Sequence, residues 1–328
     1  MVNYRVVFFM GKGGVGKTTM AATYSLMKAL NGARVLTVSL DPAHNLGDVF
    51  GTELSERPKE VVKGLQAIEI DYDAMIKKHL KRLTDKIKDI YGYLRIFNLD
   101  RYVDVLQHSP GVEEQAALER ILEILKDNER RGKYDLIVFD TPPTGLMLRI
   151  VALPTISLIW VEKLLKLREA ILTRRAAIER IAGEAPRVEV GGEVIKAATK
   201  PEEDPIYQEL LSIKSEYSFI NEVFKDRSRT YSVLVINPEV LPVLEAKRAK
   251  DFLSRLGMGV KYLIINKLIR MSNPPEELRL RMEFQRKALE LANQYFSDLR
   301  VIEVPYLSRE PRGVEELKGL TKFLSVME

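Results

Sequence analysis

The sequence predicts an α/β fold built on a doubly wound, mostly parallel sheet, and three observations favour this class. Short runs rich in β-branched residues recur from end to end of the chain. The runs are continuously apolar rather than alternating, which is typical of strands that are buried on both faces. Helical segments lie between several of the runs, as crossovers that connect parallel strands.

Seven of these runs are expected to be strands. In chain order they are residues 5–10, 34–39, 65–70, 135–140, 232–236, 262–266 and 301–304. Because ligands bind outside the carboxyl ends of the strands in open parallel sheets, the residues that follow each run are the first candidates for a site.

Three helical segments are too long to be simple crossovers between strands, and they predict an added helical lobe. Apolar residues recur at steps of three and four in residues 73–94, in residues 156–182 and from residue 205 to residue 224. We predict one domain over residues 1–328, with a helical subdomain formed by about 73–133 and 150–229. The stretch between the last two helices, residues 183–205, is rich in Gly, Pro and charge and is expected to be a mobile connection or flap.

Composition narrows the classes of function. The chain has 328 residues, 46% of them hydrophobic, which is enough for a sizeable core, and a formal net charge of +5. It contains no cysteine, which excludes disulfides, thiolate zinc sites and cysteine-ligated iron–sulfur clusters. The start, "MVNYRVVFFM", lacks the features of a signal peptide, and "IVALPTISLIWV" has about half the ~20 residues of a membrane span and is interrupted by Pro154. We expect a soluble, cytoplasmic protein.

A phosphate-binding loop follows the first strand. "GKGGVGKT", Gly11 to Thr18, fits the pattern G-x-x-x-x-G-K-[ST] and has a strand before it and a helix after it. The glycines let backbone N–H groups face phosphate oxygens, and the helix presents its positive N-terminus to the same anion. The expected nucleotide-binding residues of the loop are Gly11, Lys12, Gly13, Gly14, Val15, Gly16, Lys17, Thr18 and Thr19. Lys17 is expected to reach the β- and γ-phosphates and Thr18 to ligate Mg²⁺.

Two aspartates are candidates for the chemistry that accompanies such a loop. Asp41, in "SLDPAHNLGD", and Asp140, in "VFDTPPTG", each follow an apolar strand. Asp140 has the position of the carboxylate on the metal side of such NTPases, and Asp41 is the second candidate for work at the metal and the attacking water. Either aspartate alone is also compatible with a helix cap or a turn.

The motifs together resemble those of a known family. "GKGGVGKTT", "DPAHNLGD" and "DTPPTG", with "PGVEEQAALE", "IINKL" and "VPYLSREPRGVEELKGL", are similar to the deviant Walker A ATPases. Within them the chain resembles the branch that contains the arsenical-pump ATPases and the targeting factors for tail-anchored membrane proteins. The likeness covers nearly the whole chain and is weakest in residues 154–229.

The resemblance implies roles for individual residues. Lys12 would cross a homodimer interface to the partner's nucleotide and act there as an arginine finger does. Asp41 would orient the attacking water, and Asp140 would support Mg²⁺ through water. Further implied positions are Asn266, Pro305 and Tyr306 beside the adenine, Asn45 and Asp48 in a first switch, and Gly145 as the hinge of a second switch.

The chain also departs from the family in ways that limit its chemistry. Pro275 and Leu278 stand near the places of the C-x-x-C pair that binds zinc between subunits in eukaryotic targeting factors, so no zinc is expected. The second switch carries Pro142 and Leu146 where relatives commonly have Ala and His. Thiolate-based activation by arsenite requires cysteines that this chain lacks.

Three functions remain open from the sequence. The first is a homodimeric, Mg²⁺-dependent ATPase that carries the transmembrane segment of a client protein to a membrane receptor. The segment from Leu153 to Phe224, with Met147 and Leu148 near its start, would form one wall of the client groove. The alternative is the motor ATPase of an arsenite or metalloid efflux pump, with an unusual site at His44, His79 or His108. The third is a surface-organising switch; its short, weakly basic C-terminus argues against this, and no nucleic acid partner is expected.

Overall fold

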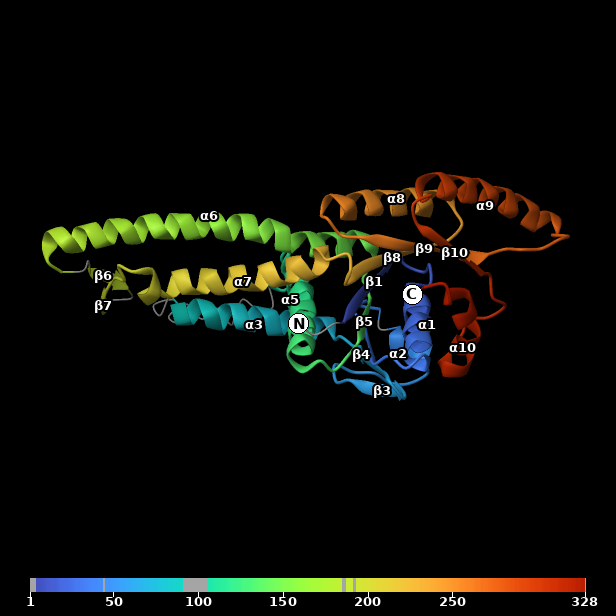
Figure 1. Cartoon of the computed structure of the whole chain (residues 1–328), viewed down its shortest axis with the longest axis horizontal. Helices are drawn as coiled ribbons and strands as arrows, with labels where there is room; N and C mark the ends of the chain where they lie inside the picture. The colour runs from blue at the N-terminus through green and yellow to red at the C-terminus, as the bar shows by residue number, and fades with distance from the viewer. Residues whose placement is uncertain (1–3, 44, 91–105, 185–186, 191–192, 328) are drawn as a thin grey trace. The chain divides into compact units, whose positions relative to one another are not determined.

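The computed structural model describes residues 4–43, 45–90, 106–184, 187–190 and 193–327 (Figure 1). The chain divides into two compact units. The sheet unit comprises Met1–Tyr72, Glu123–Arg149 and Val223–Glu328, and the helical unit comprises Asp73–Leu122 and Ile150–Glu222. The helical unit is therefore built from two insertions into the sheet unit.

The sheet unit contains an eight-stranded sheet in the order β10-β9-β8-β1-β5-β2-β4-β3. All pairs are parallel except β3 with β4, which pair antiparallel at one edge. The strands are β1 (Arg5–Gly11), β2 (Val35–Ser39), β3 (Lys59–Val62), β4 (Leu65–Glu69), β5 (Leu136–Asp140), β8 (Thr230–Ile236), β9 (Val260–Leu268) and β10 (Arg300–Pro305). The predicted α/β class and the seven predicted strands are confirmed, and β3 is an additional edge strand.

Helices cover both faces of this sheet. Figure 1 shows α1 (Lys17–Leu30), α2 (Leu46–Phe50) and α10 (Gly313–Leu324) on one side, and α8 (Val240–Arg255) and α9 (Glu276–Tyr295) on the other. β1 and β5 lie at the centre and are almost wholly buried, as expected from their continuously apolar sequences. Phe8 stacks on Phe139 between these strands on one face, and Phe9 packs against Tyr24 of α1 on the other.

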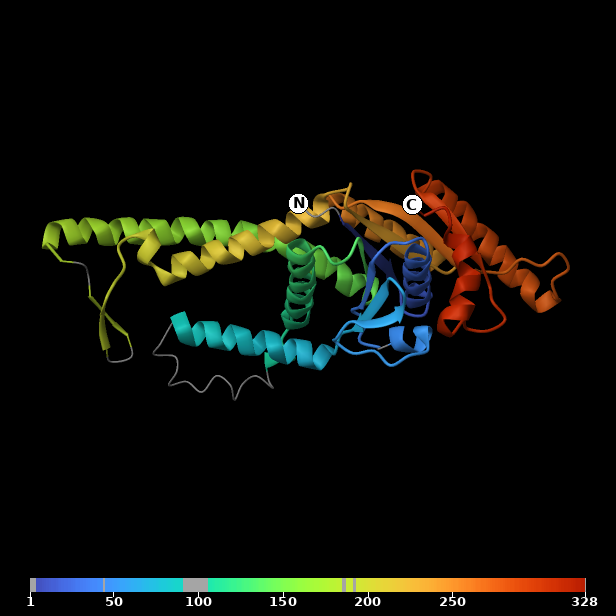
Figure 2. The ribbon, with the colours of Figure 1, turned by 60° about the horizontal axis from the view of Figure 1, so that its bottom comes forward.

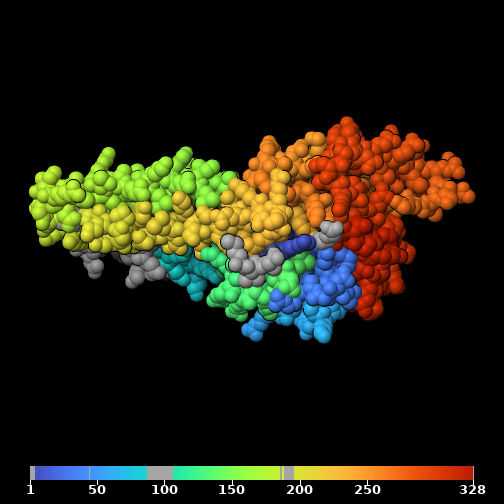
Figure 3. Space-filling view, viewed as in Figure 1, coloured from blue at the N-terminus to red at the C-terminus, as the bar shows by residue number. Residues whose placement is uncertain are grey.

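The helical unit is a set of long helices tied together by polar contacts. It contains most of α3 (Tyr72–Ile90), the first part of α5 (Val112–Arg131), and most of α6 (Thr144–Ala182) and α7 (Pro205–Lys225). Figures 2 and 3 show α6 and α7 side by side along this unit. Thr155 of α6 donates to Asn221 of α7 at 2.9 Å, and Lys86 of α3 pairs with Glu209 of α7 at 2.6 Å.

Two expectations about this unit need correction. Pro154 does not interrupt the apolar stretch. The helix α6 continues through it, although proline removes one helical N–H donor and crowds the preceding turn, because neighbouring residues such as Val151 and Ala152 are buried in packing. The connection in residues 183–205 is not wholly irregular, since it contains a two-stranded antiparallel ribbon of β6 (Arg187–Val190) and β7 (Glu193–Lys196), then a short helix, η3 (Pro201–Glu203). The alternation of β-branched and charged residues in "RVEV" and "EVIK" is a strand pattern.

Among the described residues, one helix has the length and composition to cross a membrane. It is α6, with a mean hydropathy of 1.7 over an 18-residue window, of which 33% is buried within the protein. Core helices of soluble proteins can share this length and composition. This property alone therefore does not assign α6 to a membrane.

Candidate nucleotide-binding site

The phosphate loop lies between the end of β1 and the start of α1, as the motif predicts. Gly14 and Gly16 have φ values of 77° and 90°, in the left-handed region that favours glycine. A side chain at Gly11 would meet the Val235 carbonyl at 2.4 Å, and one at Gly16 would meet the Asn266 amide nitrogen at 2.4 Å. The glycines at these positions are therefore required by backbone conformation and by close packing.

A cavity of about 550 Å³ opens over this loop at the carboxyl edge of the sheet. Its lining contains many of the residues that the sequence singled out: Gly14, Gly16, Lys17, Thr18, Thr19, Asp41, Asn45, Asp48, Asn266, Pro305 and Tyr306. It also contains residues that were not named individually from the sequence: Met20, Val49, Lys267 and the loop 307–312. Gly11, Lys12, Gly13, Val15 and Asp140 are not part of this lining. The loop, the predicted first switch segment and the expected adenine residues thus meet in one cavity within the sheet unit.

Lys17 is the buried cation of the site. It is 4% exposed, and its Nζ lies 3.1 Å from Oδ2 of Asp41. The other carboxylate oxygen of Asp41 accepts the backbone N–H of Ala43 at 3.1 Å, which orders the turn that follows β2. Lys17 therefore rests on Asp41, and a phosphate that enters the cavity would compete for the same ammonium group.

Asp140 lies fully buried at the end of β5, and neither of its carboxylate oxygens has a hydrogen-bond partner among the described residues. Burial raises the pKa of Asp140 to about 7, although the nearby Lys17 charge and Thr18 hydroxyl lower it. A buried carboxylate without partners is unfavourable unless a cation or its water shell satisfies it. The residue is thus poised for a positive ligand.

These residues fit Mg²⁺. Magnesium usually binds through one or two protein oxygens, with phosphates and water completing its octahedron, so a dense cluster of protein ligands is not needed. The described residues contain no group of three or more His, Asp or Glu side chains that could hold a metal by themselves. Thr18 and Asp140, with Asp41 nearby, are the groups that would hold the ion beside the phosphates, where it would neutralise developing charge.

The residues expected beside the adenine are placed at the cavity, but one of them has a structural task. Asn266, at 7% exposure, donates its side-chain amide to the carbonyl of Val15 at 2.8 Å and so supports the phosphate loop. The next residue, Lys267, has a positive φ of 59° and donates Nζ to the carbonyl of Gly14 at 2.8 Å. Sequence reasoning missed Lys267, although a lysine directly after "IIN" at a strand end was a usable signal.

Lys12 does not face the cavity. Its side chain is 60% exposed, and its Nζ lies 3.4 Å from Glu245 of α8. Lys12 therefore pairs with α8, whereas Lys17 pairs with Asp41. This placement agrees with a role outside the chain's own phosphate site, and that role stays a prediction.

The histidines of the alternative metalloid site do not form a common site among the described residues. His44 lies outside the described residues. His79 is buried and pairs with Glu119 at 2.9 Å within the helical unit, whereas His108 is in contact with Gln107, its neighbour in the chain. Gly145, the predicted hinge, is exposed in the first turn of α6, next to Leu146 and after Pro142.

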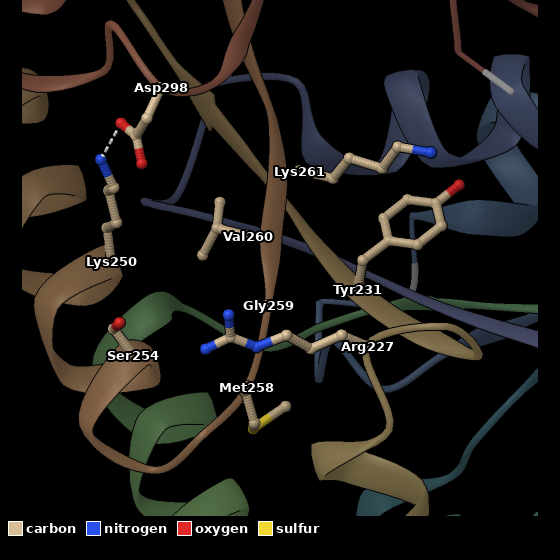
Figure 4. Close-up of a pocket in the computed structure, with 9 residues that line it drawn as sticks. All are labelled: Arg227, Tyr231, Lys250, Ser254, Met258, Gly259, Val260, Lys261 and Asp298. Carbon is tan, nitrogen blue, oxygen red and sulfur yellow. Dashed lines mark hydrogen bonds and ion pairs between the residues drawn. The ribbon is translucent and has the colours of Figure 1, made fainter.

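A second cavity, of about 260 Å³, lies at the amino ends of strands β8 and β9 (Figure 4). It is lined by Arg227, Tyr231, Lys250, Ser254, Met258, Gly259, Val260, Lys261 and Asp298. Figure 4 shows the Lys250 ammonium against the carboxylate of Asp298, so one of its cations is already neutralised. None of its residues comes from the phosphate loop or the switch segments.

The fold and site define a P-loop ATPase: a parallel sheet, a glycine loop that leads into a helix, a buried lysine and a buried carboxylate close to that lysine. The model of the anion-transporting ATPase family matches residues 4–326, and the chain belongs to this family. It is similar to a putative arsenical pump-driving ATPase 2 of Aquifex aeolicus, 32% identical over 98% of this chain and 99% of the relative. It is also similar to ATPase get3 of Aspergillus niger, 30% identical over 98% and 90% of the two chains. A third relative, ATPase ASNA1 homolog 1 of Paramecium tetraurelia, is 26% identical over 97% and 91%.

Proposed function

We propose that this chain is a homodimeric, Mg²⁺-dependent ATPase of the cytoplasm that shields the transmembrane segment of tail-anchored client proteins and delivers them to a membrane receptor. ATP binding would close the dimer, and hydrolysis would drive client release. Support comes from the family's ATPase activity, from relatives named get3 and ASNA1, and from an exposed apolar surface on the helical unit. That surface is the observation that carries the client-binding part.

The apolar surface lies on one stripe of α6. Ile156, Trp160, Leu164 and Leu167 follow one another at helical spacing, and all are exposed, with Trp160 at 61%. A separate stripe of α6, containing Val161, Leu165 and Leu172, is buried. The helix therefore has two apolar stripes, and internal packing uses only one of them. Exposed apolar surface of this kind marks sites for other proteins or membranes, and a transmembrane segment is a matching ligand.

The charges at the phosphate loop support the proposed nucleotide chemistry. The β- and γ-phosphates would take Lys17 from Asp41, since a phosphate offers more negative charge and several acceptor oxygens. The released carboxylate of Asp41 could then hold the attacking water, while Thr18 and Asp140 hold Mg²⁺. In this scheme the phosphates and Asp41 compete for the ammonium group of Lys17.

The position of Lys12 supports the proposed dimer. The side chain is exposed and directed to Glu245, so it can contribute to catalysis only after moving or by reaching a second chain. A finger from a partner would make hydrolysis depend on dimer closure. Without cysteine, no zinc–thiolate site would hold the subunits together.

The second candidate is the motor ATPase of a metalloid efflux pump. The name of the Aquifex aeolicus relative supports this candidate. The chain offers no thiolate, and its described histidines do not meet in a metal site. An ATPase that is stimulated by arsenite would favour this second function.

The test is capture of a client by the slow-hydrolysing Asp41→Asn chain. The chain is co-expressed with a model tail-anchored protein, purified in ATP and weighed by light scattering, with a client that lacks its apolar segment as the control. A complex that requires the segment supports the proposal.

Surface variants make the capture test specific for the stripe. Leu164→Glu with Leu167→Glu should abolish capture and leave ATP hydrolysis intact, whereas Leu30→Glu, a matched exposed leucine on α1, should change neither. Capture that survives the stripe variant would reject α6 as the client surface, and no capture by any form would reject the targeting function.

A further inference from the structure

The carboxylate of Glu69 lies under the first switch segment. Glu69 is the last residue of β4, and it is aligned with Ser39 of β2, which is aligned in turn with Asp140 of β5. Because aligned residues of parallel strands share a face, Glu69 and Asp140 belong to one row at the carboxyl edge. Glu69 is also close enough to Asp140 to act on its charge.

Glu69 accepts hydrogen bonds from the start of α2. Its Oε1 lies 2.9 Å from the backbone N of Leu46 and 3.4 Å from that of Gly47. These amides lie in the first turn of the helix, where no intrahelical acceptor exists. A carboxylate is a strong acceptor for such groups, so it holds the start of α2 against β4.

The helix is capped in this way although a capping residue is present. Asn45 occupies the N-cap position, where its side chain would ordinarily accept an N–H of the first turn, but it makes no such bond. Instead Asn45 lines the nucleotide cavity, together with Asp48 of the same turn. The long-range cap by Glu69 thus replaces the local one and leaves the Asn45 side chain available to the cavity.

Close packing at Gly47 is independent evidence for this contact. A side chain at Gly47 would meet the Thr52 carbonyl at 2.9 Å and Oε2 of Glu69 at 3.4 Å. The Thr52 carbonyl thus leaves no room for a side chain at Gly47, and the same backbone lies within van der Waals reach of the Glu69 carboxylate. The contact is part of a tight local fold rather than a chance approach of an exposed side chain.

We propose that Glu69 is a positioning residue for ATP hydrolysis, which fixes the segment from Asp41 to Asp48 on the wall of the nucleotide cavity by capping α2 from the neighbouring strand. The catalytic consequence rests on the proposed role of Asp41 in orienting water. Glu69 itself does not line the cavity, so it acts through the segment that it holds.

The experiment combines amide exchange with kinetics in the full-length chain. Glu69→Ala should raise the exchange rates of the Leu46 and Gly47 amides by about tenfold, because the cap that protects them is lost. It should lower kcat by about tenfold and change KM for ATP less than about threefold, since the phosphate loop holds the nucleotide independently. Glu69→Gln, which keeps an acceptor oxygen without the charge, should recover most of both losses.

Glu60→Ala, on the adjacent edge strand β3, is the matched control and should alter neither measurement. Unchanged exchange at Leu46 and Gly47 in both Glu69 variants would overturn the inference, as would faster exchange with an unaltered kcat. The proposed role of Asp41 is tested separately. Normal hydrolysis by Asp41→Asn would reject that role, and amide exchange would still decide whether Glu69 caps α2.

Discussion

Two buried clusters of charge in this molecule have similar components and opposite states. In the sheet unit, Lys17 pairs with Asp41 while the buried carboxylate of Asp140 has no hydrogen-bond partner among the described residues. In the helical unit, Arg168 binds Asp204 through two hydrogen bonds of 2.9 and 2.6 Å, and Asp204 also caps α7 by accepting the Tyr207 N–H at 2.7 Å. The cluster in the sheet unit thus contains a carboxylate without a hydrogen-bond partner among the described residues, whereas the carboxylate of the cluster in the helical unit has its partners.

The pKa values of the two aspartates reflect this difference. Burial raises the pKa of Asp140 to about 7, and Lys17 compensates only in part. Burial also raises the pKa of Asp204, but the Arg168 guanidinium and the Tyr207 amide lower it by a larger amount. The pKa of Asp204 therefore lies below its ordinary value. A buried carboxylate that the protein leaves unsatisfied indicates a ligand site, whereas one that the protein satisfies indicates a structural joint.

The largest expected effect separates the two lysines of the phosphate loop. Lys17→Ala should lower kcat/KM for ATP by about 10³-fold and weaken nucleotide binding, because the buried cation at the phosphates is lost. Lys12→Ala should leave nucleotide affinity nearly intact and lower turnover, since its charge would act at the partner's phosphate. Isothermal titration and steady-state kinetics measure both, and equal losses of affinity would reject the assignment of Lys12.

The next largest effect is a dependence of the free energy of unfolding on pH, which the titration of Asp140 should produce. Its folded pKa of about 7 lies above the ordinary value of 3.8, so the folded chain binds the extra proton between these values. The free energy of unfolding of the nucleotide-free protein should therefore fall as pH rises from about 4 to 7, by up to about 4 kcal/mol. Asp140→Asn should remove this slope in urea titrations. A slope that the substitution does not change would show that other groups cause it.

A smaller loss is expected at the satisfied cluster. Arg168→Ala leaves Asp204 buried without its partner and should destabilise the protein by about 3 kcal/mol, with ATP binding unaltered. Because the folded pKa of Asp204 is depressed, its contribution is present above the unfolded value and is lost as pH falls through the folded value. Denaturation of Asp204→Asn should accordingly show less acid sensitivity than the wild type, and a loss of ATP affinity would contradict a purely structural joint.

The smallest effect belongs to an exposed pair of the same chemistry. Lys318 and Glu315 of α10 lie 2.6 Å apart at the surface. Water screens both charges, so Lys318→Ala should change the free energy of unfolding by less than about 0.5 kcal/mol. A loss as large as that of Arg168→Ala would show that burial is not what separates these pairs.

Much of the fold was predictable from local sequence. The sequence predicted the continuously apolar strands, the motif "GKGGVGKT" after the first strand, and Asp140 at the end of another strand. Each of these signals consists of residues that lie close together in the chain at fixed spacings. β3 was missed because it is a four-residue edge strand with no buried residue, so its sequence has no continuously apolar run. The ribbon of β6 and β7 was missed because neighbouring Gly and Pro suggested a loop.

The sequence by itself determined the fold class, the phosphate loop and the kind of reaction, since these depend on residues close together in the chain. Only the tertiary structure decided that Lys17 rests on Asp41, that Asn266 supports the loop, that Glu69 caps α2 and that one stripe of α6 is left exposed. These contacts join residues far apart in the sequence, such as Asn266 and Val15. Burial and hydrogen-bond satisfaction depend on such long-range packing, and periodicity within one segment cannot specify it.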